Sequence, residues 1–99
     1  MDPKTNQLVE GGVGDRTAQA LRNLSAVLEA GGSSLQNVVK VNIFLTTMEN
    51  FAAMNKAYIQ FFEAPPKPCR TCVAVKELPL GTDVEIECIA HIGGSASNL

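Results

Sequence analysis

The sequence predicts an α+β fold in which two helices cover one face of a mixed β-sheet. Two segments have helical apolar spacing and three alternate in polarity, in the order helix, strand, helix, strand, turn, strand. The chain has 99 residues, 45% of them hydrophobic and 18% charged, which indicates one globular domain over residues 1–99. Only 5% are aromatic, so the core must depend on aliphatic side chains, and oligomer formation would stabilise so small a domain.

The first helix is predicted to begin at Asp15, an N-cap residue, and to end at Gly31 and Gly32. Residues 1–14 are polar and glycine-rich, which predicts a loop before it. Leucines recur along the helix at spacings of three and four residues and form its apolar face: Leu21, Leu24 and Leu28.

Residues 37–45 alternate in polarity and predict a strand. Thr46 and Glu49 then have the spacing of a capping box, which opens a second helix. The predicted buried face of this helix contains Phe51, Met54, Tyr58 and either Phe61 or Phe62. Asn55 shares that face because it lies four residues after Phe51, and an Asn there more often bonds a neighbouring backbone group than serves a site.

Pro65, Pro66 and Pro68 end the second helix, and two more alternating segments follow at residues 70–76 and 83–92. The turn at residues 78–82 between them predicts a hairpin. If their apolar sets share one face, the side away from the helices carries four reactive side chains: Arg70, Cys72, Glu85 and Glu87.

That face has two interpretations. In an isolated domain the face is exposed to solvent, and ion pairs on it contribute little to stability. If another subunit covers it, it becomes a pocket wall, where the planar fork of Arg70 suits a carboxylate and a neighbouring Glu can exchange protons with water.

Zinc is a competing interpretation, because Cys69-x-x-Cys72 and Cys88-x-x-His91 have ligand spacing. Both pairs lie in alternating segments, so Cys88 and His91 should point to opposite faces. No helix follows Cys72, as a thioredoxin-type redox pair would require. We therefore expect no metal, a Cys88 that packs in the core, and free thiols in a reducing compartment.

The charge distribution disfavours two classes of partner. The eight Lys and Arg residues are scattered, the net charge is −2 and the pI is about 5.2, so no basic surface for nucleic acid is expected. No apolar run is long enough to span a membrane, and no secretion leader is visible.

Several separated motifs resemble, in order, the signature of the YjgF/Rid (reactive intermediate deaminase) family over nearly the whole chain. The signature is carried by residues 68–73 (PCRTCV), the Leu78-Pro79 turn and residues 84–90 (VEIECIA). The family's middle portion is similar to residues 37–40 (NVVK), residues 51–55 (FAAMN), Tyr58 and Phe62. Residues 1–3 and 7–12 look like the loop after its second strand.

The resemblance implies a chorismate-mutase-like subunit and a homotrimer around a central barrel. It implies inter-subunit clefts that hydrolyse 2-iminobutanoate and 2-iminopropanoate to 2-keto acids and ammonia without a cofactor. In those clefts Arg70 would match the carboxylate-binding Arg and Glu85 the acid that positions or activates water. Cys72 would match the pocket thiol and Asn55 the helix Asn near the cleft.

The family pattern begins with two strands and a Gly-Pro-Tyr-Ser segment that have no counterpart here, so the resemblance implies an N-terminally shortened subunit with an exposed sheet edge. A non-catalytic regulator that binds 2-keto acids therefore stays open as an alternative. A ribonuclease or translation inhibitor is a third, which the acidic pI disfavours. The expected compartment is the cytoplasm, with the mitochondrion as the alternative.

Overall fold

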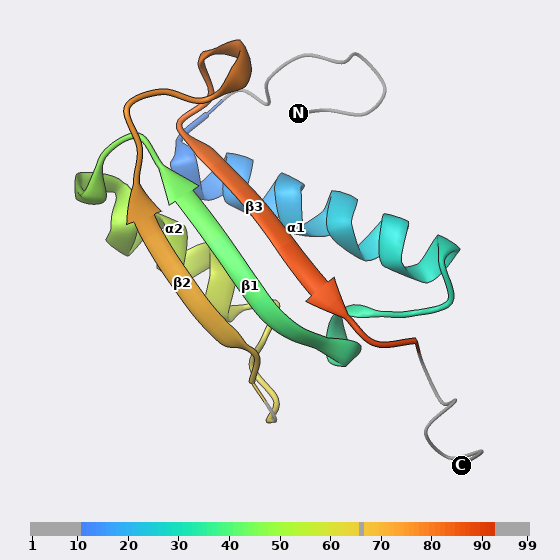
Figure 1. Ribbon diagram of the computed structural model, residues 1–99. Helices are drawn as coiled ribbons and strands as arrows, with labels where there is room; N and C mark the ends of the chain where they lie inside the picture. Colours follow the sequence, from blue (N-terminus) through green and yellow to red (C-terminus); the bar gives the residue numbers. More distant parts are fainter. Residues whose placement is uncertain (1–10, 66, 93–99) are drawn as a thin grey trace.

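The protein forms a mixed β-sheet with two helices on one of its faces (Figure 1), so the predicted fold class is confirmed. The computed structural model describes residues 11–65 and 67–92, and its sheet over these ranges has three strands. The elements are α1 (Val13–Ala30), β1 (Val38–Leu45), α2 (Phe51–Ile59), β2 (Cys69–Ala74) and β3 (Val84–Ala90). Single 3-10 turns stand before β1, before α2 and before β3.

Helix α1 begins three residues earlier than predicted. Its N-cap is Gly12, and Asp15 lies in the first turn, where its carboxylate accepts a hydrogen bond from the Gly12 N–H at 3.0 Å. Asp15 therefore stabilises the helix start from inside the helix. The helix ends at Ala30 as expected, and Leu21 is fully buried in the core.

The second helix also starts differently in detail. Thr47, and not Thr46, accepts a hydrogen bond from the Glu49 N–H at 3.2 Å and opens a 3-10 turn that leads into α2. Met54, Tyr58 and Phe62 are buried on the face that the sequence predicted.

The strand order is β2-β1-β3, so the predicted hairpin between the last two strands is wrong. Strand β1 is central, with β2 parallel on one side and β3 antiparallel on the other. The connection from β2 to β3 passes the end of β1, where the Val75 N–H donates to the Leu45 carbonyl at 2.7 Å and the Thr46 N–H donates to the Asp83 carbonyl at 3.3 Å. This connection spans two strand spacings, about 10 Å, which a hairpin turn would not reach.

The corrected pairing changes which side chains share a face. In β1, Val41 and Ile43 are 1% and 0% exposed and face the helices. Arg70 pairs with Val41, and Cys72 pairs with Ile43, so both lie on the helix side. Glu85 pairs with Phe44 and therefore lies on the helix-free side.

The same argument applies to Glu87, which pairs with Asn42 on the helix-free side. The prediction that Arg70, Cys72, Glu85 and Glu87 share one face is therefore wrong, because it depended on a hairpin that does not form. The predicted inward face of β3 is correct, since Val84 and Ile86 are buried beneath α1.

An ion pair holds α1 to the start of β3. The Arg16 Nε and Nη2 groups donate to the two oxygens of Asp83 at 2.7 Å each, in the parallel geometry that guanidinium and carboxylate favour. A further Arg16 nitrogen donates to the Gly11 carbonyl at 2.8 Å. These bonds set the position of α1 across β3.

Candidate functional site

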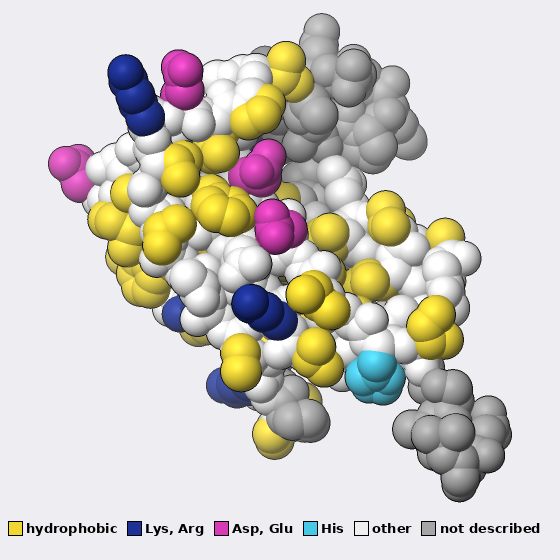
Figure 2. Space-filling view, in the orientation of Figure 1, with side chains coloured by type: hydrophobic (Ala, Val, Ile, Leu, Met, Phe, Trp, Pro, Cys, Tyr) yellow, Lys and Arg dark blue, Asp and Glu magenta, His cyan; other side chains and the backbone are white. Residues whose placement is uncertain are grey.

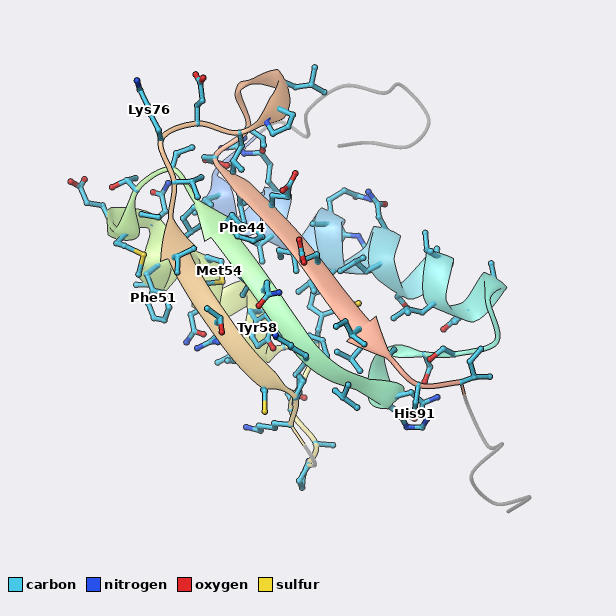
Figure 3. All side chains as sticks on the ribbon, in the orientation of Figure 1. Phe44, Phe51, Met54, Tyr58, Lys76 and His91 are labelled. Atoms are coloured by element: carbon cyan, nitrogen blue, oxygen red, sulfur yellow. The ribbon has the colours of Figure 1, made fainter. Side chains whose placement is uncertain are left out.

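Arg70 projects from β2 toward α2 and is held by three side chains of that helix. Its guanidinium carbon lies 4.7 Å from the centre of the Tyr58 ring and 5.5 Å from that of Phe51, within the range of cation–π attraction. Its Nη1 group donates a hydrogen bond to the Asn55 side-chain oxygen. The three partners are four and three residues apart and so lie along one face of α2. Figure 3 shows Phe51 and Tyr58 on the helix side of the sheet.

The position of Arg70 is fixed by neutral groups alone. Asn55 takes one of the five guanidinium N–H donors, and it is the only hydrogen-bond partner of Arg70 within residues 11–65 and 67–92. The Arg70 side chain is exposed, so the remaining donors are available to a ligand. This arrangement suits recognition of an anion with two oxygens, such as a carboxylate.

A pocket of about 280 Å³ lies beside Arg70, between α2 and the chain that enters β2. Its polar wall consists of Arg70, Lys67, Asn55 and Tyr58. Its apolar wall consists of Ile59, Phe62 and Pro68. Convergent polar groups in an apolar recess are typical of small-molecule sites.

The Cys72 thiol lies on the same side of β2 as Arg70, two residues further along the strand. It is half-buried against the core, and this burial raises its thiol pKa above the usual value, although the Arg70 charge acts in the opposite direction. The thiol therefore stays protonated at neutral pH. It can line a site and donate a weak hydrogen bond, but it is not an activated nucleophile.

Glu85 lies on the opposite side of the sheet and is exposed. Figure 2 shows acidic side chains among hydrophobic ones on this helix-free face. Two hydrophobic side chains on the face are well exposed, Val73 at 42% and Ile89 at 59%. Within one copy of the chain, Glu85 therefore does not reach the Arg70 pocket.

A second pocket, of about 270 Å³, lies between α1 and β3. Glu85 contributes to its wall, but most of its lining is apolar, with Leu24 and Val27 from α1 and Leu80 from the turn before β3. No cation lines it among the described residues, so it offers nothing to hold a carboxylate.

The four candidate zinc ligands do not gather at one point. Cys69 pairs with Lys40 on the helix-free side, whereas Cys72 lies on the helix side. Cys88 is half-buried and packs against the core, as predicted. In the described part of the chain, no group of three or more His, Cys, Asp or Glu side chains is arranged to hold a metal ion.

Of the four predicted site residues, the structure brings Arg70, Asn55 and Cys72 to one side of the sheet and leaves Glu85 on the other. Asn55 bonds a side chain and not the backbone. Sequence reasoning assigned Phe51 and Tyr58 to the core only, although their spacing around Asn55 could have indicated a cradle. Lys67 was missed because no periodic pattern includes it.

Together, the fold and the pocket define a small α+β protein with a cationic recess between a helix and an edge strand. The chain belongs to the YjgF/Rid family, because the family model described as endoribonuclease L-PSP matches residues 1–92. The predicted membership is therefore confirmed.

Three relatives illustrate the family. The mitochondrial protein mmf1 of Schizosaccharomyces pombe is 55% identical over 87 residues, covering 85% of this chain and 53% of that protein. The protein HMF1 of Saccharomyces cerevisiae is 52% identical over 85 residues, covering 86% of this chain and 65% of that protein. The 2-iminobutanoate/2-iminopropanoate deaminase of Dermatophagoides farinae is 44% identical over 92 residues, covering 93% and 71%. The chain thus spans less than two thirds of the length of the first two relatives.

Solved structures agree with the fold. RidA from an Antarctic Psychrobacter has a TM-score of 0.87 at 40% identity, covering 93% of this chain and 73% of that one. A putative endoribonuclease from Thermotoga maritima has a TM-score of 0.86 at 46% identity, covering 91% and 70%. TdcF of E. coli, solved with bound serine, has a TM-score of 0.81 at 36% identity, covering 89% and 70%.

The structure also bears on membrane association. Of the helices within residues 11–65 and 67–92, none is both long enough and apolar enough to cross a bilayer.

Proposed function

We propose that this chain takes part in the hydrolytic deamination of 2-imino acids to 2-keto acids and ammonia, in clefts formed between copies of the chain. The observation that carries the proposal is the Arg70 guanidinium, which neutral side chains hold at the wall of a 280 Å³ pocket, with no counter-charge beside it among the described residues. A substrate carboxylate would supply the missing charge and two acceptors. The similarity to an imine deaminase at 44% identity supports the reaction class.

The opposite placement of Arg70 and Glu85 is the reason to expect more than one copy at each site. The sheet lies between the two side chains, so they cannot act on one substrate from the same copy. If the helix-free face of one copy packs beside the β2 edge of the next, Glu85 of one meets Arg70 of the other. Such a contact is head-to-tail, which gives a ring when the rotation between copies closes, and we propose a closed homotrimer. Burial of the exposed Val73 and Ile89 would favour it.

The proposed chemistry uses groups of this chain. Arg70 binds the carboxylate and so orients the imine carbon, while Asn55 and the aromatic rings hold the guanidinium in place. Glu85 of the neighbouring copy accepts a proton from water as the water oxygen bonds to the imine carbon. The C=N π electrons move to the nitrogen, which takes up a proton from solvent, so that a carbinolamine forms. Its nitrogen then takes the proton that Glu85 holds. The C–N bond breaks as the hydroxyl gives up its proton to solvent and its oxygen forms the carbonyl, and ammonia and the 2-keto acid leave. The Cys72 thiol, on the same side of β2 as Arg70, stays a neutral group.

Mixing two variants tests the shared site. Arg70→Ala and Glu85→Gln should each be inactive on imine generated in situ. After co-refolding, a mixed oligomer contains some sites with both wild-type groups, one from each copy, so part of the activity should return. Absence of any recovery, with mixed oligomers present by mass, would contradict a site shared between copies.

A regulator that binds 2-keto acids without turnover is the second candidate. One observation favours it, because the Arg70 pocket within a single copy contains an anchor and, among the described residues that line it, no acid. Binding of 2-ketobutyrate by a parent chain that never hydrolyses the imine would place this candidate first. For the compartment we propose the cytoplasm or the mitochondrion, the latter because a relative at 55% identity is named as mitochondrial.

A further inference from the structure

The Arg70 pocket has a second cation on its wall, Lys67. We propose that this pocket prefers ligands with two anionic groups, namely 2-keto or 2-imino dicarboxylic acids, and that Lys67 determines this preference. The inference rests on the proposed function in that Arg70 is taken as the anchor for the first carboxylate. Lys67 would then bind the second.

The spacing of the two cations fits a short diacid. Lys67 lies three residues before Arg70, and β2 begins between them, at Cys69. Three residues separate the Cα atoms by at most about 10 Å. Both side chains are long and exposed, and both line the same pocket, so their charged ends can approach a ligand from two sides.

The pocket provides no internal counter-charge. None of the described residues that line it is acidic, and the ion pair between Arg16 and Asp83 lies at the other end of the sheet, where β3 begins. Ile59, Phe62 and Pro68 surround the cations with apolar surface, which reduces screening of the field by water. The positive charges of Lys67 and Arg70 repel each other in this pocket. A ligand with two negative charges would reduce that repulsion by pairing with both cations.

The hydroxyl of Tyr58 is an independent indication that the pocket binds a polar ligand. It lines the pocket, is 5% exposed, and its hydroxyl has no hydrogen-bond partner among the described residues. Buried hydroxyls in folded proteins normally have such a partner. An oxygen-rich ligand, or the water that it orders, would provide one.

A monocarboxylate would satisfy Arg70 and leave Lys67 without a counter-charge. A dicarboxylate gains the second pair, and for exposed charges this corresponds to binding up to about fivefold more tightly at low salt. The advantage should shrink as salt is added, because the second pair is screened.

The test compares 2-ketobutyrate with 2-ketoglutarate by calorimetric titration of the parent, Lys67→Gln and Lys56→Gln. Lys56 is the matched control, since it is an exposed lysine next to Asn55 that does not line the pocket. We expect the parent and the Lys56 variant to prefer 2-ketoglutarate, and the Lys67 variant to lose the preference because its affinity for 2-ketoglutarate falls more than its affinity for 2-ketobutyrate. Equal binding of the two acids by the parent, or a preference that survives Lys67→Gln, would overturn the inference.

Two further arms separate this inference from the proposed function. Inorganic phosphate that competes as well as 2-ketoglutarate would indicate a general anion site and would also overturn the preference for diacids. Arg70→Ala should abolish binding of both acids. If 2-ketobutyrate binds through Arg70 without any preference for the diacid, the proposed function stands and the role of Lys67 is wrong. If Arg70→Ala leaves 2-ketobutyrate binding intact, the anchor itself is wrong.

Discussion

Arg70 and Glu85 leave the sheet on opposite sides, Arg70 from β2 toward α2 and Glu85 from β3 toward the helix-free face. Two groups expected to serve one substrate are thus separated by the thickness of the sheet. A site that contains both Arg70 and Glu85 requires a second copy of the chain. We therefore expect that a change which prevents assembly also abolishes activity.

The first prediction concerns that assembly. Ile89→Asp places a charge among the exposed hydrophobic side chains of the helix-free face, where burial against another copy would make it unfavourable. We expect the parent to sediment as a trimer, and this variant to dissociate and lose any imine hydrolysis while its circular dichroism stays unchanged.

Val27→Asp is the matched control for assembly. Val27 is 68% exposed on α1, away from the helix-free face, and its replacement should leave the trimer intact. A parent that sediments strictly as a folded monomer would remove the shared site from consideration.

The Arg70 anchor leads to a graded series. Arg70→Lys keeps the charge but replaces two parallel hydrogen bonds with a point contact, so it should lose much of the affinity for 2-ketobutyrate. Arg70→Ala should lose more, on the order of 2–5 kcal/mol if the ligand pair is buried. Arg22→Ala, on the exposed side of α1, is the control and should bind normally. Titration of all three against the parent measures the series.

Glu85→Gln should behave differently from the Arg70 variants. It removes the group that accepts a proton and keeps the shape of the side chain, so 2-keto-acid binding should persist while turnover falls. Loss of binding and turnover to the same extent would mean that Glu85 holds the ligand and does not act on water.

Tyr58 allows the ring and the hydroxyl to be separated. The ring lies under Arg70, while the buried hydroxyl has no partner among the described residues. Tyr58→Phe keeps the ring and should raise the free energy of unfolding slightly or leave it unchanged. Tyr58→Leu loses the ring face and should weaken 2-ketobutyrate binding. A large loss of stability in Tyr58→Phe, measured by urea unfolding, would show that the hydroxyl has a partner in solution.

The helices and strands were predictable because their signals are local. The leucine spacing of α1 and the glycines that follow it act within a few residues. The N-cap of α1 was missed by three positions, and the residue that opens the turn before α2 was missed by one. The exception within a strand is Val39, which is 50% exposed because a β-bulge between Val38 and Lys40 interrupts the alternation.

Strand order and the site could not be predicted to the same extent. Alternation shows which residues lie on each side of β2, but not which strand pairs with it. The apolar side of β2, which carries Val73, faces away from the helices. The contact between Arg70 and Asn55 joins residues 15 positions apart through tertiary packing, for which no local pattern exists. Arg70 was nevertheless singled out, by the fit of its guanidinium to a carboxylate and by resemblance to a family, and Asn55 was singled out by the resemblance alone.

The last prediction concerns stability at acid pH. The hydrogen bonds from Arg16 hold the pKa of Asp83 below its ordinary value of 3.8, although partial burial acts in the opposite direction. The unfolded chain therefore binds the Asp83 proton more readily than the folded protein does. The stabilisation is fully present above the unfolded pKa and is lost as the pH falls from about 3.8 through the lower folded pKa.

Asp83→Asn should accordingly lower the free energy of unfolding at pH 6 by about 1–3 kcal/mol, as expected for partly buried hydrogen bonds to a charged group. The difference from the parent should shrink between pH 4 and pH 2, measured by urea unfolding at each pH. Glu29→Gln removes an exposed carboxylate near the end of α1 and should leave the pH profile unchanged. If the Asp83→Asn profile stays parallel to that of the parent down to pH 2, the ion pair with Arg16 does not contribute to stability through its charge.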